Sequence, residues 1–363
     1  MIIRCFKSVF IAFVMMLCLM SSCQVDPNGR IADPVTIKVA VVFEDPMTEE
    51  CGGQYVHQWC RTPGYDYSWN NPREQLPAFI EAIRESSHGY VNYEVVEVYE
   101  ADTTFTYFTH LPEVRHFSMT ELEEYLRLPD WSPFDRGKIR YDYAGMVAHY
   151  GFDRKCDAGE IDEVWIYSTP VSGCYESHLM GKDGFWLNSQ PEEATCNELL
   201  TVMFFNYERD LACALESYGH RFESIMLEVY GWWDYDNKAT KEELTTWEKY
   251  TGYAKKYEKY NPGNSHVGIV HFPPNGVRDY DFCNENSVMS YADNWFDYPE
   301  VKEEGGRLMN CKEWGGHEGY MRWWLSHMPH FEGISPYDGK LNNWWHYVVK
   351  YREAVAYEKE LSE

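Results

Sequence analysis

The sequence is poor in basic residues. It contains 32 Lys and Arg against 58 Asp and Glu, so its formal net charge is −26 at pH 7. Proteins that bind the phosphate backbone of DNA or RNA need a basic surface, because the release of counterions from phosphates supplies much of their binding free energy. The composition therefore predicts that nucleic acid is not a partner of this protein.

Several motifs are also missing. No two cysteines have the Cys-x-x-Cys spacing that is typical of thiolate zinc sites. The sequence has no internal repeat and no glycine-rich loop of the kind that cradles phosphate. A thiolate zinc module, a repeat architecture and a phosphate-binding loop are therefore not expected.

The N-terminal apolar run is too short for a comfortable membrane span. It covers residues 9–20 and follows two basic residues, whereas a spanning helix needs about 20 apolar residues. A basic region, a short apolar region and small residues at the cleavage site are typical of an export signal. The Ser-Ser-Cys sequence that ends at Cys23 resembles the lipobox of bacterial lipoproteins, in a form similar to that of the Bacteroidota. The resemblance implies that residues 1–22 are removed and that Cys23 carries lipid.

A lipidated Cys23 would anchor the chain to a lipid bilayer. The protein is then expected at the outer membrane or cell surface, although a periplasmic orientation stays open. Residues 23–35 are polar and contain Pro and Gly, which predicts a tether between the lipid and the folded part. An exported chain can form disulfides, and Cys51 and Cys60, which bracket a Gly-Gly loop, are the expected pair.

Strand-like and helix-like segments alternate between residues 36 and 231. Apolar runs rich in β-branched residues predict strands, and helical periodicity predicts helices between them. The expected strands are 36–43, 93–99, 160–168, 185–188 and 201–206, and the expected helices are 73–86, 118–128 and 141–150. This order predicts an α/β fold with a mostly parallel sheet. Residues 232–363 are predicted to form a second, irregular and aromatic-rich part packed against the first, with a strand at 267–272 and helices at 241–260, 320–327 and near the C-terminus.

The clearest element is a helix of about twenty residues that follows the strand 201–206. Leu215, Tyr218 and Phe222 belong to its apolar stripe, which is expected to face the core. A polar stripe is expected to face solvent and contains Ser217, Arg221, Ser224 and Glu228. Between the two stripes, Glu216, His220 and Glu223 follow at i, i+4 and i+7 and share a narrow arc. Three potential ligands at the border of core and solvent predict a cleft there.

Residues 214–222, Ala-Leu-Glu-Ser-Tyr-Gly-His-Arg-Phe, resemble the active-site helix of the zincin metallopeptidases, in which Gly often precedes the second His. That helix carries His-Glu-x-x-His, whose histidines bind zinc and whose Glu is the general base. Here Glu216 replaces the first His, and Ser217 replaces the catalytic Glu. The resemblance implies a zincin-like N-terminal half and a divalent metal such as zinc on Glu216 and His220, because carboxylate oxygen also binds zinc. Glu223, one turn further on, is the nearest candidate for the base.

The other candidate site residues lie mostly in the C-terminal part. His271, which precedes a rigid Pro-Pro turn, and Glu313, in an exposed turn, are the candidates for a third metal ligand. The residues predicted to bind substrate are Trp233, Asn275, Trp314 and His317. Glu176 and His178, in the glycine-rich loop after residue 168, are further polar residues within reach of a site.

Several short stretches together resemble a family of secreted bacterial and fungal proteins that is uncharacterised. They are residues 206–209, 219–221, 270–276, 313–315 and 342–345. This resemblance covers most of the chain after the signal but implies no chemistry.

Two classes of function follow from these patterns. The first is a metal-dependent hydrolase of zincin-like architecture that acts on an extracellular peptide or glycan. The second is a non-catalytic glycan-binding lipoprotein, whose stacking platforms would be Trp232, Trp233, Trp295 and Trp314. A glycosidase that uses Glu216 and Glu223 as its two carboxylates is a third alternative. The observation that separates them is whether His271, Glu313 or His317 meets Glu216 and His220 at a common point.

Overall fold

The computed structural model describes residues 32–49, 52–129, 131, 138–192, 196–233, 240–252 and 266–363. The export signal, Cys23 and Cys51 lie outside these ranges, so the lipid anchor and the disulfide between Cys51 and Cys60 stay predictions. Within the described ranges, no helix combines the length and the apolar character needed to cross a membrane.

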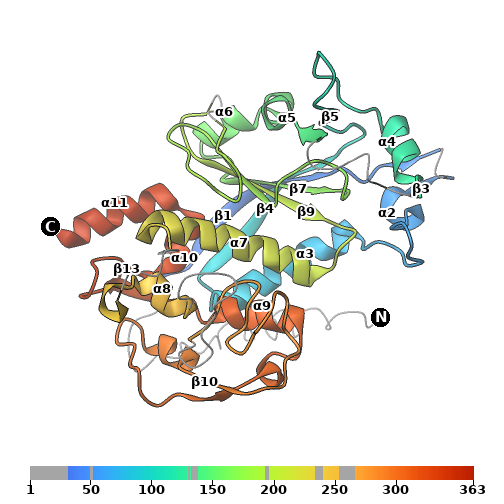
Figure 1. The fold of residues 1–363 in the computed structure, drawn as a ribbon. Helices are drawn as coiled ribbons and strands as arrows, with labels where there is room; N and C mark the ends of the chain where they lie inside the picture. The colour runs from blue at the N-terminus through green and yellow to red at the C-terminus, as the bar shows by residue number, and fades with distance from the viewer. Residues whose placement is uncertain are drawn as a thin grey trace, which may run out of the picture.

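A five-stranded sheet lies at the centre of the fold (Figure 1). Its strand order is β4-β1-β7-β9-β8. Four strands are parallel, and β8 pairs with β9 in the antiparallel direction at one edge. The strands are β1 (Val35–Phe43), β4 (Val91–Glu100), β7 (Glu163–Ser168), β8 (Ser177–Met180) and β9 (Leu200–Asn206). The prediction of an α/β fold with a mostly parallel sheet is therefore confirmed.

Helices cover both faces of the sheet, so alternate residues of its strands enter two different cores. Ile37, Val39 and Val41 of β1 pack with α3 (Pro72–Ser86) and α7 (Leu211–Tyr230). Ala40 and Val42, on the opposite face, pack with α5 (Tyr143–Tyr150) and α6 (Phe152–Asp157). All six residues of β7 are buried, as expected for a parallel strand that is covered on both sides.

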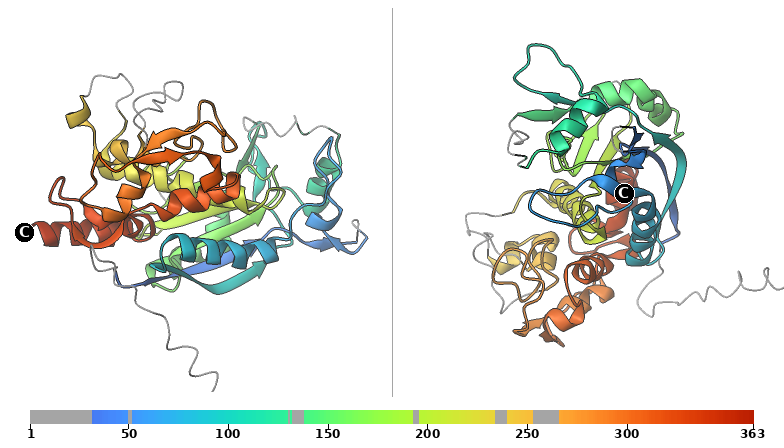
Figure 2. Two further views of the ribbon diagram at one scale, coloured as in Figure 1. Left: turned by 90° about the horizontal axis from the view of Figure 1, so that it is seen from below. Right: turned by 90° about the vertical axis from the view of Figure 1, so that its right-hand side faces the viewer.

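The C-terminal half covers the face of α7 that is turned away from the sheet (Figure 2). It contributes α9 (His317–Ser326) and α10 (Trp344–Val349), which contact α7, and it ends with α11 (Tyr351–Ser362). Phe222 of α7 packs edge-on against both Trp324 and Trp345. The larger hydrophobic core thus extends through both predicted parts of the chain.

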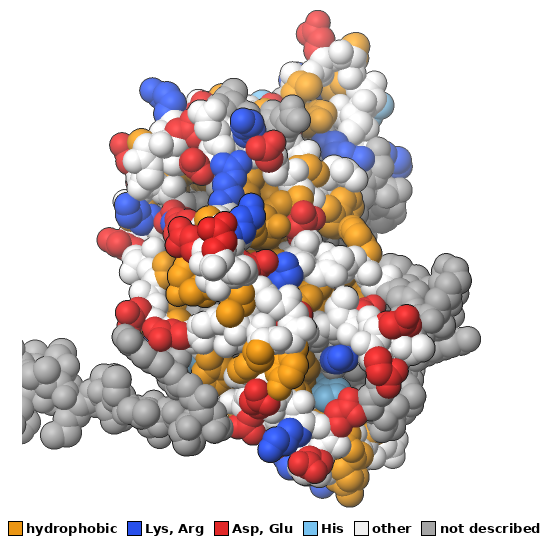
Figure 3. Space-filling model, turned by 90° about the vertical axis from the view of Figure 1, so that its left-hand side faces the viewer, with side chains coloured by type: hydrophobic (Ala, Val, Ile, Leu, Met, Phe, Trp, Pro, Cys, Tyr) orange, Lys and Arg blue, Asp and Glu red, His pale blue; other side chains and the backbone are white. Residues whose placement is uncertain are grey.

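The remaining elements are short, and most of them flank the sheet or lie within the C-terminal half. They are β2 (Met47–Thr48), β3 (Gln54–Tyr55), α2 (Val56–Trp59), β5 (Thr106–Phe108), α4 (Met119–Leu126), β6 (Ile139–Tyr141), η2 (Lys241–Glu243), α8 (Thr246–Thr251), β10 (Val288–Ser290), η3 (Ala292–Asp297), β11 (Arg307–Met309), η4 (Cys311–Glu313), β12 (His330–Ile334) and β13 (Leu341–Asn343). On the face seen in Figure 3, Lys and Arg side chains lie among Asp and Glu side chains.

Two predicted strands are wrong. The edge strand is β8, which precedes the predicted segment 185–188. Residues 267–272 form a tight turn, in which Ile269 and Phe272 exchange backbone hydrogen bonds of 3.0 Å in both directions. The carbonyls of this turn accept hydrogen bonds from α9 instead of a neighbouring strand: Tyr320 donates to Ile269 at 2.8 Å, and Trp324 donates to the carbonyl of Gly268 at 2.9 Å. Side chains of α9 therefore satisfy the backbone that a sheet would otherwise satisfy.

The solvent stripe predicted for α7 is wrong for three of its four residues. Glu228 is exposed as predicted, but Ser217, Arg221 and Ser224 are buried, because the sheet and the C-terminal half enclose the helix from both sides. Both oxygens of Glu163 accept hydrogen bonds from Arg221, at 2.6 and 2.9 Å, and Arg221 also donates to the carbonyl of Val348 at 2.7 Å. A buried charge is tolerated when it is paired and hydrogen-bonded in this way.

Candidate metal centre

One ridge of α7 carries four potential metal ligands. Cys213, Glu216, His220 and Glu223 are spaced by three or four residues, so their side chains line up along one face. The helix begins beside the carboxyl end of β9, where Asp210 caps it and accepts a hydrogen bond from the backbone N–H of Cys213 at 3.3 Å. The ridge therefore starts at the edge of the sheet where ligands of open α/β folds commonly bind.

Three ligand atoms converge beside this ridge. Nε2 of His271 lies 3.0 Å from Nε2 of His220 and 3.1 Å from Oε1 of Glu216. Nε2 of His220 lies 3.9 Å from the same Glu216 oxygen. Two ligands of a tetrahedral zinc ion lie about 3.3 Å apart, since each is about 2.0 to 2.1 Å from the metal. The three distances bracket this value, so Glu216, His220 and His271 can bind one ion.

Each histidine contacts a carboxylate through Nδ1, the ring nitrogen that faces away from the point where the ligand atoms meet. Nδ1 of His220 lies 3.0 Å from Oε2 of Glu223, and Nδ1 of His271 lies 3.1 Å from Oδ1 of Asp279. When Nδ1–H donates to a carboxylate, the lone pair of Nε2 points to the metal, and this outer contact fixes the ring. Both histidines are thus held in the orientation that a metal requires.

The electrostatics of the centre favour a cation. Burial raises the pKa of Glu216, but contacts with His271 and His317 outweigh it and hold that pKa well below its usual range. Burial also opposes charge on His220, yet the contact with Glu223 and the negative charges of Glu176 and Glu216 raise its pKa to about 9. The carboxylates therefore create a negative potential at the point where the three ligand atoms meet.

The base role predicted for Glu223 does not agree with its position. One of its oxygens contacts His220, and the other accepts the backbone N–H of Val270 at 3.0 Å. Both oxygens are engaged in holding the ligand segments together. Glu223 is therefore better described as a positioning residue for His220.

The centre opens into a cavity of about 310 Å³. Its lining residues are Cys174, Tyr175, Glu176, Asn188, Arg209, Glu216, His220, His271 and Tyr280. A smaller cavity of about 130 Å³ is also lined by Cys174, Glu176 and Arg209, so the two cavities are neighbours. Glu176, which the sequence suggested only as a loop residue within reach, is the carboxylate of the larger cavity that does not belong to the ligand group.

Tyr280 was missed by the sequence analysis as a site residue. Its hydroxyl donates to Oε1 of Glu216 at 2.9 Å, and its backbone has φ of 58°. A bulky residue in this left-handed region is strained and commonly marks a functional position. Tyr280 follows Asp279 in an acidic, aromatic loop, which was the only signal that the sequence offered.

The structure places His317 and Glu313 differently, although they are close in the sequence. Nε2 of His317 lies 2.8 Å from Oε2 of Glu216, the oxygen that does not face His271. Glu313 pairs with Arg307 at 2.7 Å and belongs to neither group of potential metal ligands found among the described residues. Glu313 is therefore not supported as a ligand, whereas His317 lies beside the centre.

The other residues predicted to bind substrate serve the core. Trp233 is buried, and Trp314 is buried with its Nε1 donating to the carbonyl of Phe282 at 2.8 Å. Asn275 is buried and braces a loop by donating to the carbonyls of residues 284 and 286 at 2.7 and 2.8 Å. In the part of the chain that the structure describes, none of these three residues belongs to the lining of the two cavities beside the centre. His178 is also buried, with Nδ1 2.8 Å from Oγ of Ser189.

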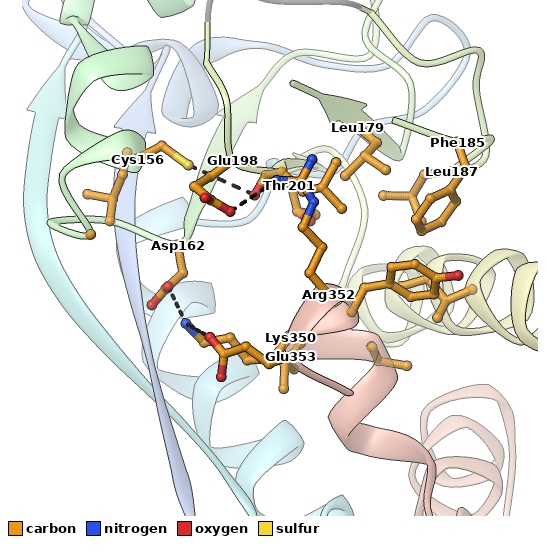
Figure 4. A pocket seen from close by; sticks show the side chains of 17 residues that line it. Cys156, Asp162, Leu179, Phe185, Leu187, Glu198, Thr201, Lys350, Arg352 and Glu353 are labelled. Atoms are coloured by element: carbon orange, nitrogen blue, oxygen red, sulfur yellow. Dashed lines mark hydrogen bonds and ion pairs between the residues drawn. The ribbon is translucent and has the colours of Figure 1, made fainter. Parts of the chain in front are cut away.

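A separate cavity of about 230 Å³ lies beside the start of α11 (Figure 4). Its charged groups are paired: Lys350 contacts Asp162 at 2.5 Å, and Arg352 contacts Glu198 at 3.1 Å. None of its residues belongs to a potential ligand group among the described residues. This cavity therefore gives no indication of metal chemistry.

Gly219 allows the ligand segments to approach one another. A Cβ at this position would lie 2.8 Å from Cγ2 of Val270 and 3.0 Å from Cε of Met321. Val270 precedes His271, so a side chain at position 219 would push this segment away from α7, whereas the flexible end of Met321 could move aside.

We expect Gly219→Ala to lower the free energy of unfolding by about 1 to 3 kcal/mol, because overpacking outweighs the gain in helix propensity. Zinc binding should weaken at the same time, since the shift reaches His271. Urea denaturation and zinc titration measure the two effects. Glu228→Ala, on the exposed side of the same helix, is the control, and an equally small change in both variants would contradict the packing argument.

Comparison with known proteins assigns neither a family nor a function to this chain. No family model matches the sequence, and neither a curated protein nor a solved structure matches it. The candidate metal centre is therefore argued from its own geometry.

Proposed function

We propose that the protein is a metal-dependent hydrolase of the cell envelope, with a divalent ion such as zinc on Glu216, His220 and His271. The observation that carries the proposal is the convergence of these three ligand atoms, with a carboxylate behind each histidine, at the wall of a cavity. Structural zinc sites use four protein ligands, whereas catalytic sites use three and leave a position for water or substrate. Three ligands at a cavity fit the catalytic type.

A bound ion of this kind supplies Lewis acidity and activates water. Glu176 lines the cavity, and one of its oxygens accepts a hydrogen bond from Nδ2 of Asn188 at 2.7 Å, which orients the carboxylate. This arrangement suits a general base and replaces the role predicted for Glu223. The Tyr280 hydroxyl at the same wall donates its one proton to Oε1 of Glu216, so its role in the proposal is to orient this metal ligand.

The substrate class that we propose is an extracellular peptide or glycan, as the sequence suggested. A cavity of about 310 Å³ is large enough for one side chain or one sugar ring. Arg209 is the basic residue that lines both cavities, and it can attract a negatively charged group of the substrate. The proposed location at the envelope, through lipid on Cys23, rests on the N-terminal sequence.

The burial of three tryptophans disfavours the alternative of a glycan-binding protein without catalysis. Trp233, Trp295 and Trp314 are at most 7% exposed, and only Trp232 of the four predicted platforms is exposed, at 63%. Buried rings cannot stack on a sugar. The alternative of a two-carboxylate glycosidase is disfavoured because the contacts of Glu216 and Glu223 with histidines occupy both carboxylates.

Metal content and hydrolysis test the proposal together. Protein purified without a chelator is expected to contain a stoichiometric divalent metal by plasma mass spectrometry. It is expected to cleave members of a panel of peptides and cell-wall glycans, to lose this activity with a chelator and to regain it with zinc. Protein that neither contains metal nor binds added zinc would overturn the proposal.

A further inference from the structure

Glu216 offers ligand atoms in two directions. Its Oε1 lies 3.1 Å from Nε2 of His271 and accepts a hydrogen bond from Tyr280 at 2.9 Å. Its Oε2 lies 2.8 Å from Nε2 of His317. The ion proposed above needs only Oε1, so the second oxygen of this buried carboxylate faces a different histidine.

A second group of potential ligands lies on that other side. Cys213, Glu216 and His317 each present one ligand atom, and these atoms lie within 4.8 Å of one another. Cys213 is one turn before Glu216 on the same ridge, and His317 is the first residue of α9. Thiolate, imidazole and carboxylate are the three donor types that zinc prefers in proteins.

Packing fixes the members of this group. The imidazole of His317 stacks on the ring of the buried Phe282, with the ring centroids 4.5 Å apart and the planes 6° from parallel. The capped first turn of α7 holds Cys213, and its thiol forms no disulfide among the described residues. A rigid group of this kind needs little reorganisation to bind an ion.

Members of both groups line neighbouring cavities. Glu216, His220 and His271 line the larger cavity, and Cys213 lines the smaller one. Cys174, Glu176 and Arg209 line both cavities. Each group therefore has at least one member at the wall of a cavity.

We propose that Cys213, Glu216 and His317 form a second metal position, so that Glu216 bridges two divalent ions of the zinc class. Carboxylate-bridged ions in two-metal hydrolases lie about 3.5 to 4 Å apart, which one carboxylate spans with its two oxygens. The inference rests on the proposed function for the first ion, which would remain with a single metal if the second position failed. A second ion would hold the bridging carboxylate and add positive charge beside the substrate cavity.

Metal counting and cobalt spectroscopy test the second position. The chain purified under reducing conditions is expected to bind two equivalents of zinc, and Cys213→Ser or His317→Gln is expected to bind one. After replacement of zinc by Co²⁺, a thiolate-to-cobalt charge-transfer band is expected in the wild-type protein and in His220→Ala but not in Cys213→Ser. Cys283→Ser, which removes an exposed cysteine outside the group, is the control and should keep both ions and the band.

Each outcome separates the two proposals. One equivalent of zinc in the wild-type protein, unchanged in Cys213→Ser and without the charge-transfer band, would overturn the second position and leave the first. One equivalent that is lost in Cys213→Ser but kept in His220→Ala would overturn the first position, and with it the bridge. Circular dichroism checks that the variants fold, and the band in the wild-type protein decides the thiolate contact even if a variant does not.

Discussion

His220→Ala is expected to abolish hydrolysis and to weaken zinc binding at the first position by more than about 100-fold. The loss of an outer carboxylate typically costs about 10-fold to 100-fold in affinity, and the loss of a ligand costs more. His220 supplies one of three converging atoms, and alanine leaves Glu216 and His271 with an incomplete set. Zinc competition with a chromophoric chelator measures the affinity, and the rate on the best substrate of the panel measures the activity.

Two glutamate variants distinguish a residue that positions a metal ligand from a residue that acts as the general base. Glu223→Gln keeps an acceptor for His220 but removes the charge, so zinc affinity should fall by about 10-fold to 100-fold. Glu176→Gln should leave zinc affinity unchanged and lower kcat by about 10²-fold to 10⁴-fold, as expected for a general base. The opposite pattern, in which Glu223→Gln keeps the metal and loses only kcat, would restore the base role to Glu223.

Local periodicity was sufficient to predict the four parallel strands of the sheet and the shared face of Glu216, His220 and Glu223 on α7. The apolar run at 36–43 corresponds to β1, and Glu216 and His220 do share one helix face. These features depend on residues that are close in the sequence, where backbone geometry fixes the direction of each side chain. The same reasoning predicted the wrong solvent stripe, since periodicity cannot show that a second layer covers the polar face that contains Arg221.

The partners of the ridge depend on contacts between distant segments. His271 reaches α7 from a turn that the sequence suggested was a strand, and this turn is held by α9 side chains that come later in the chain. Glu313 and His317 lie in one short segment, and only the packing of α9 decides that His317 is the residue that contacts Glu216. Asp279 and Tyr280 have no periodic pattern, so their roles follow only from the folded loop.

Glu163→Ala is expected to lower the free energy of unfolding by about 3 to 5 kcal/mol. Glu163 is 1% exposed and accepts hydrogen bonds from Arg221 at 2.6 and 2.9 Å and from Nε1 of Trp165 at 2.9 Å. Alanine would leave the guanidinium buried without its counter-charge. Urea denaturation measures the loss, with Glu81→Ala as the control, because the pair of Glu81 with Arg84 is exposed and its removal should change stability little.

The double variant Glu163→Leu/Arg221→Met shows whether the pair itself stabilises the fold. Removing one partner leaves an uncompensated charge, whereas replacing both by apolar residues of similar volume is often neutral. We therefore expect the double variant to regain most of the stability lost in Glu163→Ala. A loss in the double variant as large as in the single one would instead mean that the bonds to Trp165 and to the Val348 carbonyl are the stabilising contacts. Because Arg221 is adjacent to His220, this pair also ties the ligand ridge to β7 at the centre of the sheet.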